Sequence, residues 1–398
     1  MDEPPRDKPI FSFYGDNFMG STDALDALAR NGVRGVLFLH PPDAAELKGF
    51  AGCRAVGIAG ESRSQSPEWM RGALPAVFES LRQIGAPVVQ YKVRPTFDSS
   101  PEAGSIGCAL EIGQDVLAVP FVPVAPAAPA LRCHAVFGNL FAADGDEIYR
   151  TDLRAHLARQ TSRKAALMDI LALGEPDAGA RLERAIEERP GAVLFDGLDA
   201  ASVEKSAALI WESRRTPPTG SWRCRGVAPR LPGARSSTLC TRGFSGIRLN
   251  AAQLPRTGSN GPYQEAVLAK ALRHLSRGHS VVLCSAPGIP ESGEVPDRRA
   301  LASEMGKLLR APIARSGVHR AVVAGSDTCS RAVRELEIAA LTVLAPLAPG
   351  VPLCQAFAKG ARSTGLELAF KAGAMGSDKF FEEVLRGGGK VMVSFGER

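Results

Sequence analysis

The chain alternates short apolar runs with longer segments of helical periodicity. In the first half each apolar run is bounded by Gly, Pro or Asp, as buried parallel strands are. We predict strands at Ile10–Tyr14, Gly35–Leu39, Ala55–Ala59, Val88–Val93, Leu117–Val122 and Ala192–Phe195. The intervening segments repeat apolar residues at helical spacing and predict helices over Thr22–Asn31, Pro67–Ile84, Leu153–Leu171 and Asp199–Ser213. This alternation predicts a mostly parallel sheet covered by helices on both faces.

The same alternation returns from about Ser245 onward. The predicted strands are Ile247–Leu249, Val281–Cys284, Ala321–Ala324, Leu341–Leu344, Leu366–Lys371 and Val391–Phe395, and the predicted helices are Tyr263–Ser276, Asp297–Leu309 and Asp378–Leu385. A chain of 398 residues exceeds what one core usually supports. We therefore predict two α/β domains, residues 1–213 and 245–398, each a mostly parallel sheet flanked by helices.

Composition points to a cytoplasmic protein. No apolar run reaches the roughly 20 residues of a membrane span, and the charged start MDEPPRDKPI lacks the apolar core of a signal peptide. The eight cysteines form no CxxC pair and the six histidines are dispersed. These residues predict buried free thiols and no metal site. No membrane partner is expected.

The net charge of +6 is concentrated in one segment. Nine arginines lie between Arg214 and Arg256, where no acidic residue occurs. That segment contains Trp222 and Phe244 but no series of interleaved aromatic residues of the kind that stack on bases, so we expect no nucleic-acid partner. We predict that residues 214–244 form an anomalous basic linker.

Two loops of the first half combine strand ends with polar side chains. Asp16 follows the first strand, and ligands of open α/β sheets bind outside such carboxyl ends. Its carboxylate could accept a proton or hold a cation, with Gly20 permitting close approach and Ser21 or Thr22 capping the next helix. A plain strand–turn–helix with Asp16 as a turn residue is the equal alternative.

The second loop, YKVRPTFDSSPEAGSIG, follows the strand that ends at Val93. Its hydroxyls and glycines suit a polyhydroxylated acid. The alternative is a helix start capped within SSPE, and both interpretations can hold together.

Two loops of the second half suit phosphate. The strand Ala321–Ala324 leads into Gly325, Ser326, Asp327 and Thr328 before a helix, where free backbone N–H groups bind anions. Lys371 is followed by Gly373 and Gly376 before another helix. Each loop alone is a weak signal, and two in one domain strengthen the case for a nucleotide.

In combination these four motifs resemble the four-carbon acid sugar kinase family, which phosphorylates acids such as threonate, erythronate and 3-oxo-tetronate. The family's loops read D-D-x-T-G-[AS]-x-D, S-T-F-D-S followed by G-[NS]-I-G, G-G-[ED]-T-[SA] and K-x-G-x-x-G. Here the matches are Asp16, Gly20, Ser21, Asp23, Thr96, Phe97, Asp98, Ser99, Gly104, Ile106, Gly107, Gly325, Asp327, Thr328, Lys371, Gly373 and Gly376.

The resemblance implies a kinase that uses ATP and Mg²⁺, with its active site in the cleft between the two domains. It implies Asp16 as the catalytic base. It assigns the sugar acid to Arg63, Lys92, Thr96, Asp98 and Ser99, although a surface role for Arg63 is equally open. It assigns ATP to Gly325, Asp327, Thr328, Lys371, Gly373 and Gly376.

Several positions depart from the family pattern. Asn17 replaces a second aspartate, Met19 a threonine, Pro95 a serine and Ser326 a glycine, the last where a positive φ is expected to cause a clash. The His/Pro-rich stretch before Asp152 and two turns at the start of the nucleotide domain are missing. A degenerate, non-catalytic member is therefore the alternative function, and a Rossmann dehydrogenase is disfavoured because no GxGxxG follows a strand.

The missing turns coincide with the basic segment 214–244, for which we hypothesise a frameshift. One permissible codon choice for Arg230–Leu239, read from its third base, encodes an amphipathic helix. A natural basic linker is the alternative. Sequencing the gene tests the hypothesis, which fails if no single-base slip restores a G-S or S-P-x-T turn. The sequence does not determine which acid is the substrate, and leaves a homo-oligomer open.

Overall fold

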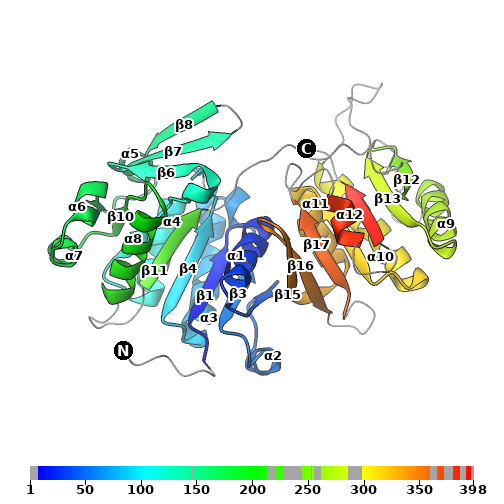
Figure 1. Cartoon of the computed structure of the whole chain (residues 1–398), viewed down its shortest axis with the longest axis horizontal. Helices are drawn as coiled ribbons and strands as arrows, with labels where there is room; N and C mark the ends of the chain where they lie inside the picture. Colours follow the sequence, from blue (N-terminus) through cyan, green and yellow to red (C-terminus); the bar gives the residue numbers. More distant parts are fainter. Residues whose placement is uncertain are drawn as a thin grey trace. The chain divides into compact units, whose positions relative to one another are not determined.

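The computed structural model describes residues 8–94, 96–144, 147–213, 221–226, 244–251, 253–254, 261–285, 298–358, 365–371, 380–385 and 391–395. The chain divides into two compact units. The first comprises Met1–Ala24 and Asn31–Arg230, and the second comprises Leu25–Arg30 and Leu231–Arg398. Each unit is built from strands and helices, with colours running from blue to green in the first and from yellow to red in most of the second (Figure 1).

The first unit contains a parallel sheet in the strand order β2-β3-β1-β4-β11-β5-β10-β9. Its strands are β1 Phe11–Gly15, β2 Gly35–Phe38, β3 Ala55–Ala59, β4 Val88–Val93, β5 Val122–Val124, β9 Ala165–Met168, β10 Ala192–Phe195 and β11 Ser221–Gly226. The predicted parallel sheet is confirmed. Strand β11 lies within segment 214–244, and the rest of that segment up to residue 243 lies outside the described residues.

Helices cover both faces of this sheet, as the apolar pattern predicted. They are α1 Phe18–Arg30, α2 Ala44–Gly49, α3 Pro67–Ile84, α4 Ile106–Leu117, α5 Leu153–Ala158, α6 Ile170–Gly174, α7 Ala178–Glu187 and α8 Ala200–Ser213, with short 3₁₀ helices η1 Ser62–Ser64 and η2 Pro129–Leu131. Leu194 of β10 packs in the core that α3 and α4 cover. Its neighbours Val193 and Phe195 pack with α6, α7 and α8 on the other face. Successive side chains of a strand point to opposite faces, so an apolar run is buried throughout.

Local signals set the bounds of α3. The Ser66 hydroxyl accepts the N–H of Trp69, Pro67 is the first helical residue, and Gly85 ends the helix at a φ of 72°. Met70, Leu74, Phe78 and Leu81 form its buried stripe.

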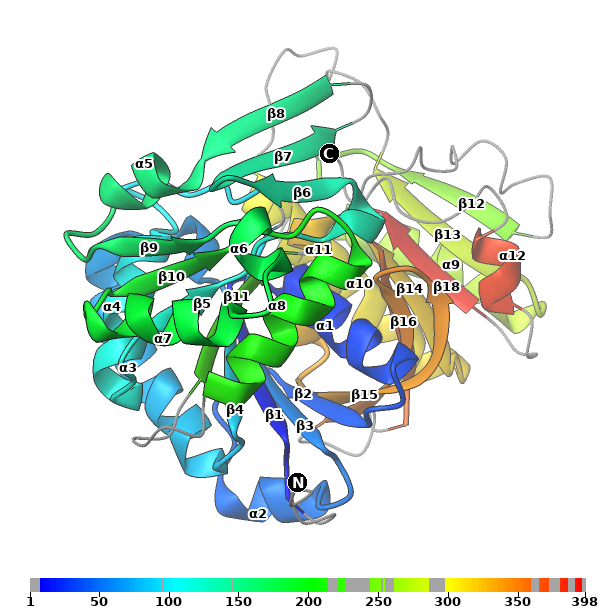
Figure 2. The ribbon, with the colours of Figure 1, turned by 60° about the vertical axis from the view of Figure 1, so that its left-hand side comes forward.

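A second, smaller sheet of the first unit was not predicted. It is antiparallel and consists of β6 Cys133–Val136, β7 Asn139–Asp144 and β8 Glu147–Asp152 (Figures 1 and 2). The buried carboxylate of Asp196 accepts the N–H groups of Phe137 and Gly138 in the β6–β7 turn, at 2.5 and 3.0 Å. This contact fixes the turn to the end of β10.

Two predictions in the first unit are wrong in part. The predicted strand Leu117–Val122 lies largely outside β5, because α4 continues to Leu117 and ends at Ala118 with a φ of 52°. The predicted helix Leu153–Leu171 is interrupted by β9, which pairs with β10. The Asp169 side chain then caps α6 by accepting the N–H of Ala172 at 2.8 Å. Pairing with a neighbouring strand outweighs the helical propensity of the sequence AALM in β9.

The second unit contains a mixed sheet in the order β12-β13-β18-β14-β17-β16-β15. Its elements are β12 Phe244–Leu249, β13 Ser280–Ser285, β14 Arg320–Ala324, β15 Ile338–Ala348, β16 Val351–Ala358, β17 Glu367–Lys371, β18 Val391–Phe395, α9 Pro262–Ser276, α10 Arg298–Ser316, α11 Ser326–Glu335 and α12 Phe380–Leu385. Strands β12, β13, β18, β14 and β17 run parallel, as predicted.

The predicted strand Leu341–Leu344 belongs to an antiparallel hairpin that was not foreseen. Strand β15 pairs with β16, which in turn pairs antiparallel with β17. Gly350 permits the tight turn between β15 and β16 with a φ of 74°. Among the described residues, no helix is both long and apolar enough to cross a membrane.

Candidate active site

Asp16 lies where three neighbouring parallel strands of the first unit end. Its N–H donates to the carbonyl of Lys92 at the end of β4, at 2.9 Å. Its own carbonyl accepts the N–H of Arg63, which follows β3, at 3.0 Å. The backbone therefore brings Asp16, Arg63 and Lys92 together at the carboxyl edge of the sheet, where ligands of open α/β sheets bind.

The Asp16 carboxylate is buried and incompletely bonded. The residue is 5% exposed, and its Oδ1 atom has no hydrogen-bond partner among the described residues. Burial raises the pKa of Asp16 to about 6, while Arg63, Lys92 and Arg94 act in the opposite direction. A carboxylate with this pKa is ionised near neutral pH and can still accept a proton, which suits a general base.

The first turn of α1 gives Asp16 its surroundings. The Asn17 side chain caps this turn by accepting the N–H of Gly20 at 2.6 Å. The expectation that Ser21 or Thr22 caps the helix is wrong, because their hydroxyls donate back to the carbonyls of Asn17 and Met19. A Cβ at Gly20 would lie 3.7 Å from Asp16 Oδ1, so the glycine keeps the space beside this oxygen open.

Lys92 is buried beside Asp23 of α1. Lys92 Nζ lies 3.3 Å from Asp23 Oδ2 and 3.3 Å from the carbonyl oxygen of Val93. The ion pair neutralises a lysine that burial would otherwise make unfavourable. Lys92 therefore acts on Asp16 through its charge at the base of the site.

Arg63 and Arg94 share one carboxylate. Arg63 Nη2 lies 2.6 Å and Arg94 Nη1 3.3 Å from Asp98 Oδ2. Burial, and next the charge of Arg94, lower the pKa of Arg63. Since one acceptor serves two planar cations, a ligand carboxylate can take a guanidinium from Asp98.

The loop between Arg94 and Ser100 is strained. Buried Phe97 has a φ of 58°, which is unfavourable for a residue with a side chain. The Thr96 Oγ1 atom nearby is buried without a hydrogen-bond partner among the described residues. Strain and an unsatisfied hydroxyl in one loop are typical of a ligand site.

The helix after this loop does not begin at SSPE. Ser105 caps α4 by accepting the N–H of Cys108, whereas Ser100 accepts the N–H groups of Glu102 and Ala103 in a turn. A helix start within SSPE was therefore a wrong expectation. Gly104 has a φ of 60°, and a Cβ there would lie 2.3 Å from the carbonyl oxygen of Arg63.

Two residues near Ser99 were missed by sequence analysis. His156 Nε2 lies 2.9 Å from Ser99 Oγ, and the Gln160 side-chain NH₂ donates to the same oxygen at 2.9 Å. Both lie in or just after α5, which sequence analysis placed inside a longer helix. No local motif marks them, because their proximity to Ser99 depends on the tertiary fold.

In the second unit, Gly325 connects β14 to α11. Its φ of 101° and ψ of 127° require glycine, and its N–H donates to the carbonyl of Lys371 at 2.9 Å. The expected clash at Ser326 does not occur, because Gly325 carries the positive φ and Ser326 begins the helix. Thr328 is buried in the first turn, and Asp327 is exposed.

Lys371 ends β17 directly beside Gly325. Its side chain is buried, and Nζ lies 5.9 Å from the ring centroid of Phe380. The predicted residues Gly373 and Gly376 lie outside the described residues. The structure thus brings Gly325, Asp327, Thr328 and Lys371 to neighbouring strand ends, where the first N–H groups of α11 lack helical acceptors.

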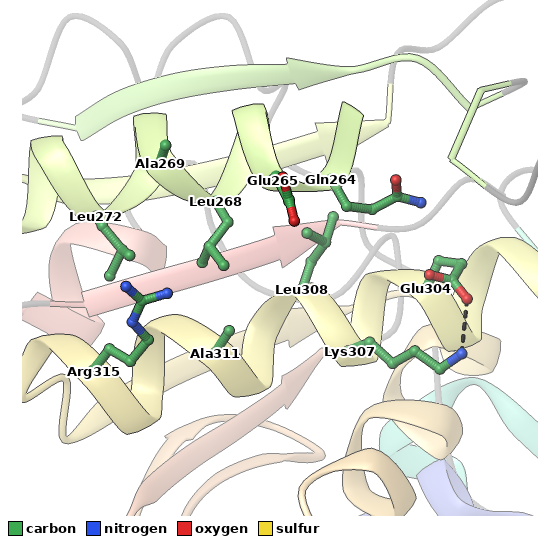
Figure 3. A pocket seen from close by; sticks show the side chains of 10 residues that line it. All are labelled: Gln264, Glu265, Leu268, Ala269, Leu272, Glu304, Lys307, Leu308, Ala311 and Arg315. Carbon is green, nitrogen blue, oxygen red and sulfur yellow. Dashed lines mark hydrogen bonds and ion pairs between the residues drawn. The ribbon is translucent and has the colours of Figure 1, made fainter. Parts of the chain in front are cut away.

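The second unit also has a pocket of about 470 Å³ between α9 and α10 (Figure 3). Leucines and alanines of both helices line it together with Gln264, Glu265, Glu304, Lys307 and Arg315. A salt bridge of 2.8 Å joins Lys307 Nζ to Glu304 Oε1 at one end. The pocket contains none of the predicted nucleotide residues. We assign it no role in the reaction.

Two family models match the chain. A sugar-binding N-terminal domain matches residues 11–226, and a nucleotide-binding C-terminal domain matches residues 237–381. The chain is 34% identical to 3-oxo-isoapionate kinase of Paraburkholderia graminis, with 95% of this chain and 94% of that protein covered. It is 28% identical to 3-oxo-tetronate kinase of Cupriavidus necator, with 95% and 97% covered.

Solved structures share the fold. A crystal structure of a Salmonella typhimurium protein matches with a TM-score of 0.76 at 20% identity, covering 94% of this chain and 98% of that one. A Haemophilus influenzae protein matches with a TM-score of 0.72 at 18% identity, with the same coverage. The two domain matches and the two kinase relatives define the class as two-domain kinases of sugar acids. The chain belongs to the four-carbon acid sugar kinase family.

Proposed function

We propose that this protein uses ATP to phosphorylate a hydroxyl of a four-carbon acid sugar, or of a close relative such as 3-oxo-isoapionate. The candidate substrates with four carbons are threonate, erythronate and 3-oxo-tetronate. The buried Asp16 Oδ1, which lacks a partner among the described residues, is the observation that carries the proposal. A buried carboxylate oxygen kept unpaired is unfavourable unless a ligand hydroxyl completes it.

Asp16 accepts the proton of the attacking hydroxyl. Its raised pKa of about 6 lets it orient that hydroxyl as a carboxylate and take its proton as the bond to phosphorus forms. Gly20 leaves room for the substrate next to Oδ1. The positive charges of Arg63, Lys92 and Arg94 stabilise the ionised form.

Arg63, Lys92, Thr96, Asp98 and Ser99 bind or orient the sugar acid. The planar guanidinium of Arg63 donates two parallel hydrogen bonds to the carboxylate of the acid, once the guanidinium is no longer bound to Asp98. Asp98 and Thr96 then hydrogen-bond the substrate hydroxyls, and Ser99 contributes a further hydroxyl. Lys92 is held by Asp23 and acts through its charge.

ATP is held by Gly325, Asp327, Thr328 and Lys371, together with Gly373 and Gly376. The open N–H groups at the start of α11 and the adjacent Lys371 fit phosphate oxygens. No cluster of three metal-ligating side chains occurs among the described residues. A bound Mg²⁺ would neutralise phosphate charge, and the exposed carboxylate of Asp327 is a side chain that could help to hold it.

The alternative is a degenerate member that binds nucleotide poorly. Asn17 and Met19 in the first loop favour it, because each replaces a polar group of the family pattern. The missing turns near segment 214–244 favour it as well.

We also propose a cytoplasmic location, in keeping with the proposed metabolic role.

An ATP-coupled assay with threonate, erythronate, 3-oxo-tetronate and 3-oxo-isoapionate tests the proposal. We expect turnover with one of these acids, dependent on Mg²⁺, and its loss in Asp16→Ala with an unchanged circular dichroism spectrum. Failure of the wild-type protein to bind ATP or to phosphorylate any of these acids would instead favour the non-catalytic alternative. A normal rate in Asp16→Ala would remove the assigned base.

A further inference from the structure

The side-chain amide of Gln160 has its orientation dictated by α4. Its Oε1 atom accepts the N–H of Ile106 at 2.8 Å and lies 3.4 Å from the backbone nitrogen of Gly107. Backbone N–H groups only donate, so the amide oxygen must face them. Gly107 allows this approach, since a Cβ there would lie 2.7 Å from Gln160. The NH₂ group of Gln160 therefore points away from α4.

That NH₂ group points at Ser99. Gln160 Nε2 lies 2.9 Å from Ser99 Oγ, and because an amide NH₂ only donates, the serine oxygen must accept. One of the two lone pairs of Ser99 is thereby used.

His156 uses the second lone pair. Its Nδ1 atom lies 3.4 Å from Arg159 Nη2, and a guanidinium cannot accept a hydrogen bond. Nδ1 is therefore the acceptor of the neutral ring, and Nε2 carries the hydrogen that it donates to Ser99 Oγ at 2.9 Å. Burial and the charge of Arg159 lower the pKa of His156, against the opposing effects of the Phe97 carbonyl and Asp98. The lowered pKa favours the neutral ring.

The Ser99 hydroxyl hydrogen is then left to point elsewhere. The carbonyl oxygen of Phe97 lies 3.5 Å from Ser99 Oγ, at the limit of a hydrogen bond. The ring of Phe97 packs 5.7 Å from that of His156, so the same histidine supports the strained loop. A ligand oxygen in front of Ser99 would offer a better acceptor.

We propose that Gln160 and His156 are positioning residues that fix the Ser99 hydroxyl as a hydrogen-bond donor to an acceptor-only oxygen of the sugar acid, either its carboxylate or its ketone. This inference rests on the proposed function for the identity of the ligand. A serine that can only donate requires an acceptor in the ligand. A carboxylate or ketone oxygen only accepts and therefore fits this serine, whereas a substrate hydroxyl fits it only through a lone pair, with its own hydrogen directed elsewhere.

The variant Gln160→Glu tests this polarity at almost constant shape. It keeps an oxygen for the N–H groups of Ile106 and Gly107 but replaces the donor to Ser99 by a second acceptor. Ser99 then donates to that acceptor, and we expect the Kd of the sugar acid, measured by calorimetry without ATP, to rise at least tenfold. The control Gln83→Glu makes the same change at an exposed position of α3 and should leave Kd unaltered.

A double-mutant cycle separates the role through Ser99 from charge repulsion. Ser99→Ala should also raise Kd at least tenfold, and Gln160→Glu should add less than twofold in that background. The inference is overturned if Gln160→Glu has its full effect without the Ser99 hydroxyl, or no effect with it. Equal effects on a 3-oxo acid and its 3-hydroxy analogue identify the carboxylate as the acceptor, and a larger effect on the 3-oxo acid identifies the ketone. A larger effect on the 3-hydroxy acid contradicts the inference.

The histidine tautomer provides a test that needs no ligand. In ¹⁵N NMR of histidine-labelled protein at pH 8, the signals lost in His156→Gln identify this ring among the six histidines. We expect a protonated Nε2 and an unprotonated Nδ1. The opposite tautomer would refute the inference, whereas failure of every acid to bind the wild type would refute only the proposed function.

Discussion

Lys92 Nζ lies 3.3 Å from Asp23 Oδ2, and both side chains are buried at the base of the candidate active site. Removing one partner of such a pair leaves the other charge buried and uncompensated, which destabilises a protein by about 3–5 kcal/mol. We therefore expect Lys92→Met to lower the free energy of unfolding by this amount, as measured by urea denaturation. The double variant Lys92→Met/Asp23→Leu should recover most of the loss. Equal destabilisation by the single and double variants would show that the pair does not carry the effect.

The pH dependence of catalysis should follow the raised pKa of Asp16. The proposed base works only as a carboxylate, and its pKa in the folded protein is about 6. We expect kcat/KM to fall about tenfold per pH unit below pH 6 and to level off above it, since kcat/KM reports groups of the free enzyme. As controls, the ionisation of the substrate and the activity of the coupling enzymes are measured over the same pH range. A profile that stays flat down to pH 4.5 would contradict the role of Asp16.

Asp16 should also make the protein less stable at neutral pH. Its folded pKa lies above the unfolded value of 3.8, so the folded state binds the proton more tightly and loses stability as pH rises from about 4 to 6. The difference corresponds to about 3 kcal/mol at pH 7. We expect Asp16→Asn to raise the unfolding free energy at pH 8 by about 1–3 kcal/mol while lowering kcat by about 10²–10⁴-fold. Equal stability of Asp16→Asn and wild type at pH 8 would argue against a buried, ionised carboxylate.

Gly104 should be required for the position of Arg63. Its φ is 60°, and a Cβ there would lie 2.3 Å from the Arg63 carbonyl oxygen, so Gly104→Ala must move the backbone of η1. We expect KM for the sugar acid to rise at least tenfold. The control is Gly32→Ala, where φ is 75° but nothing lies within 4 Å of a new Cβ. That variant should lose only about 1–2 kcal/mol of stability, with unchanged KM. A KM for the sugar acid that is unchanged in Gly104→Ala, as in Gly32→Ala, would show that Gly104 is not required for substrate binding.

The strand ends that carry Asp16 and Lys92 were predictable from the sequence. Asp16 follows one predicted strand and Lys92 lies near the end of another, but their backbone contact of 2.9 Å depends on the strand order, which the sequence does not show. Gly325 and Lys371 likewise lie at ends of predicted strands, and the structure shows that these two strands are neighbours. Strand ends can be located in the sequence because a strand that is buried on both faces is a nearly continuous run of apolar residues.

The neighbours of Ser99 could not be predicted in this way. His156 and Gln160 lie 57 and 61 positions further along the chain. Their placement depends on β9, whose residues have helical propensity and become a strand only by pairing with β10. The pairing of Lys92 with Asp23 was equally hidden, because charge and motif alone do not show which cation a buried carboxylate will meet.

Gly325 provides the sharpest test of the nucleotide site. Its φ of 101° with ψ of 127° is unfavourable for any residue with a side chain, and the turn starts the helix whose N–H groups are proposed to meet phosphate. We expect Gly325→Ala to raise KM for ATP at least tenfold with little change in the Kd of the sugar acid, because that ligand binds residues of the first unit. The control Gly317→Ala lies at a φ of 66° with nothing within 4 Å of its Cβ, so it should lower stability slightly and leave both constants unchanged. An unaltered KM for ATP in Gly325→Ala would place the phosphates elsewhere in the second unit.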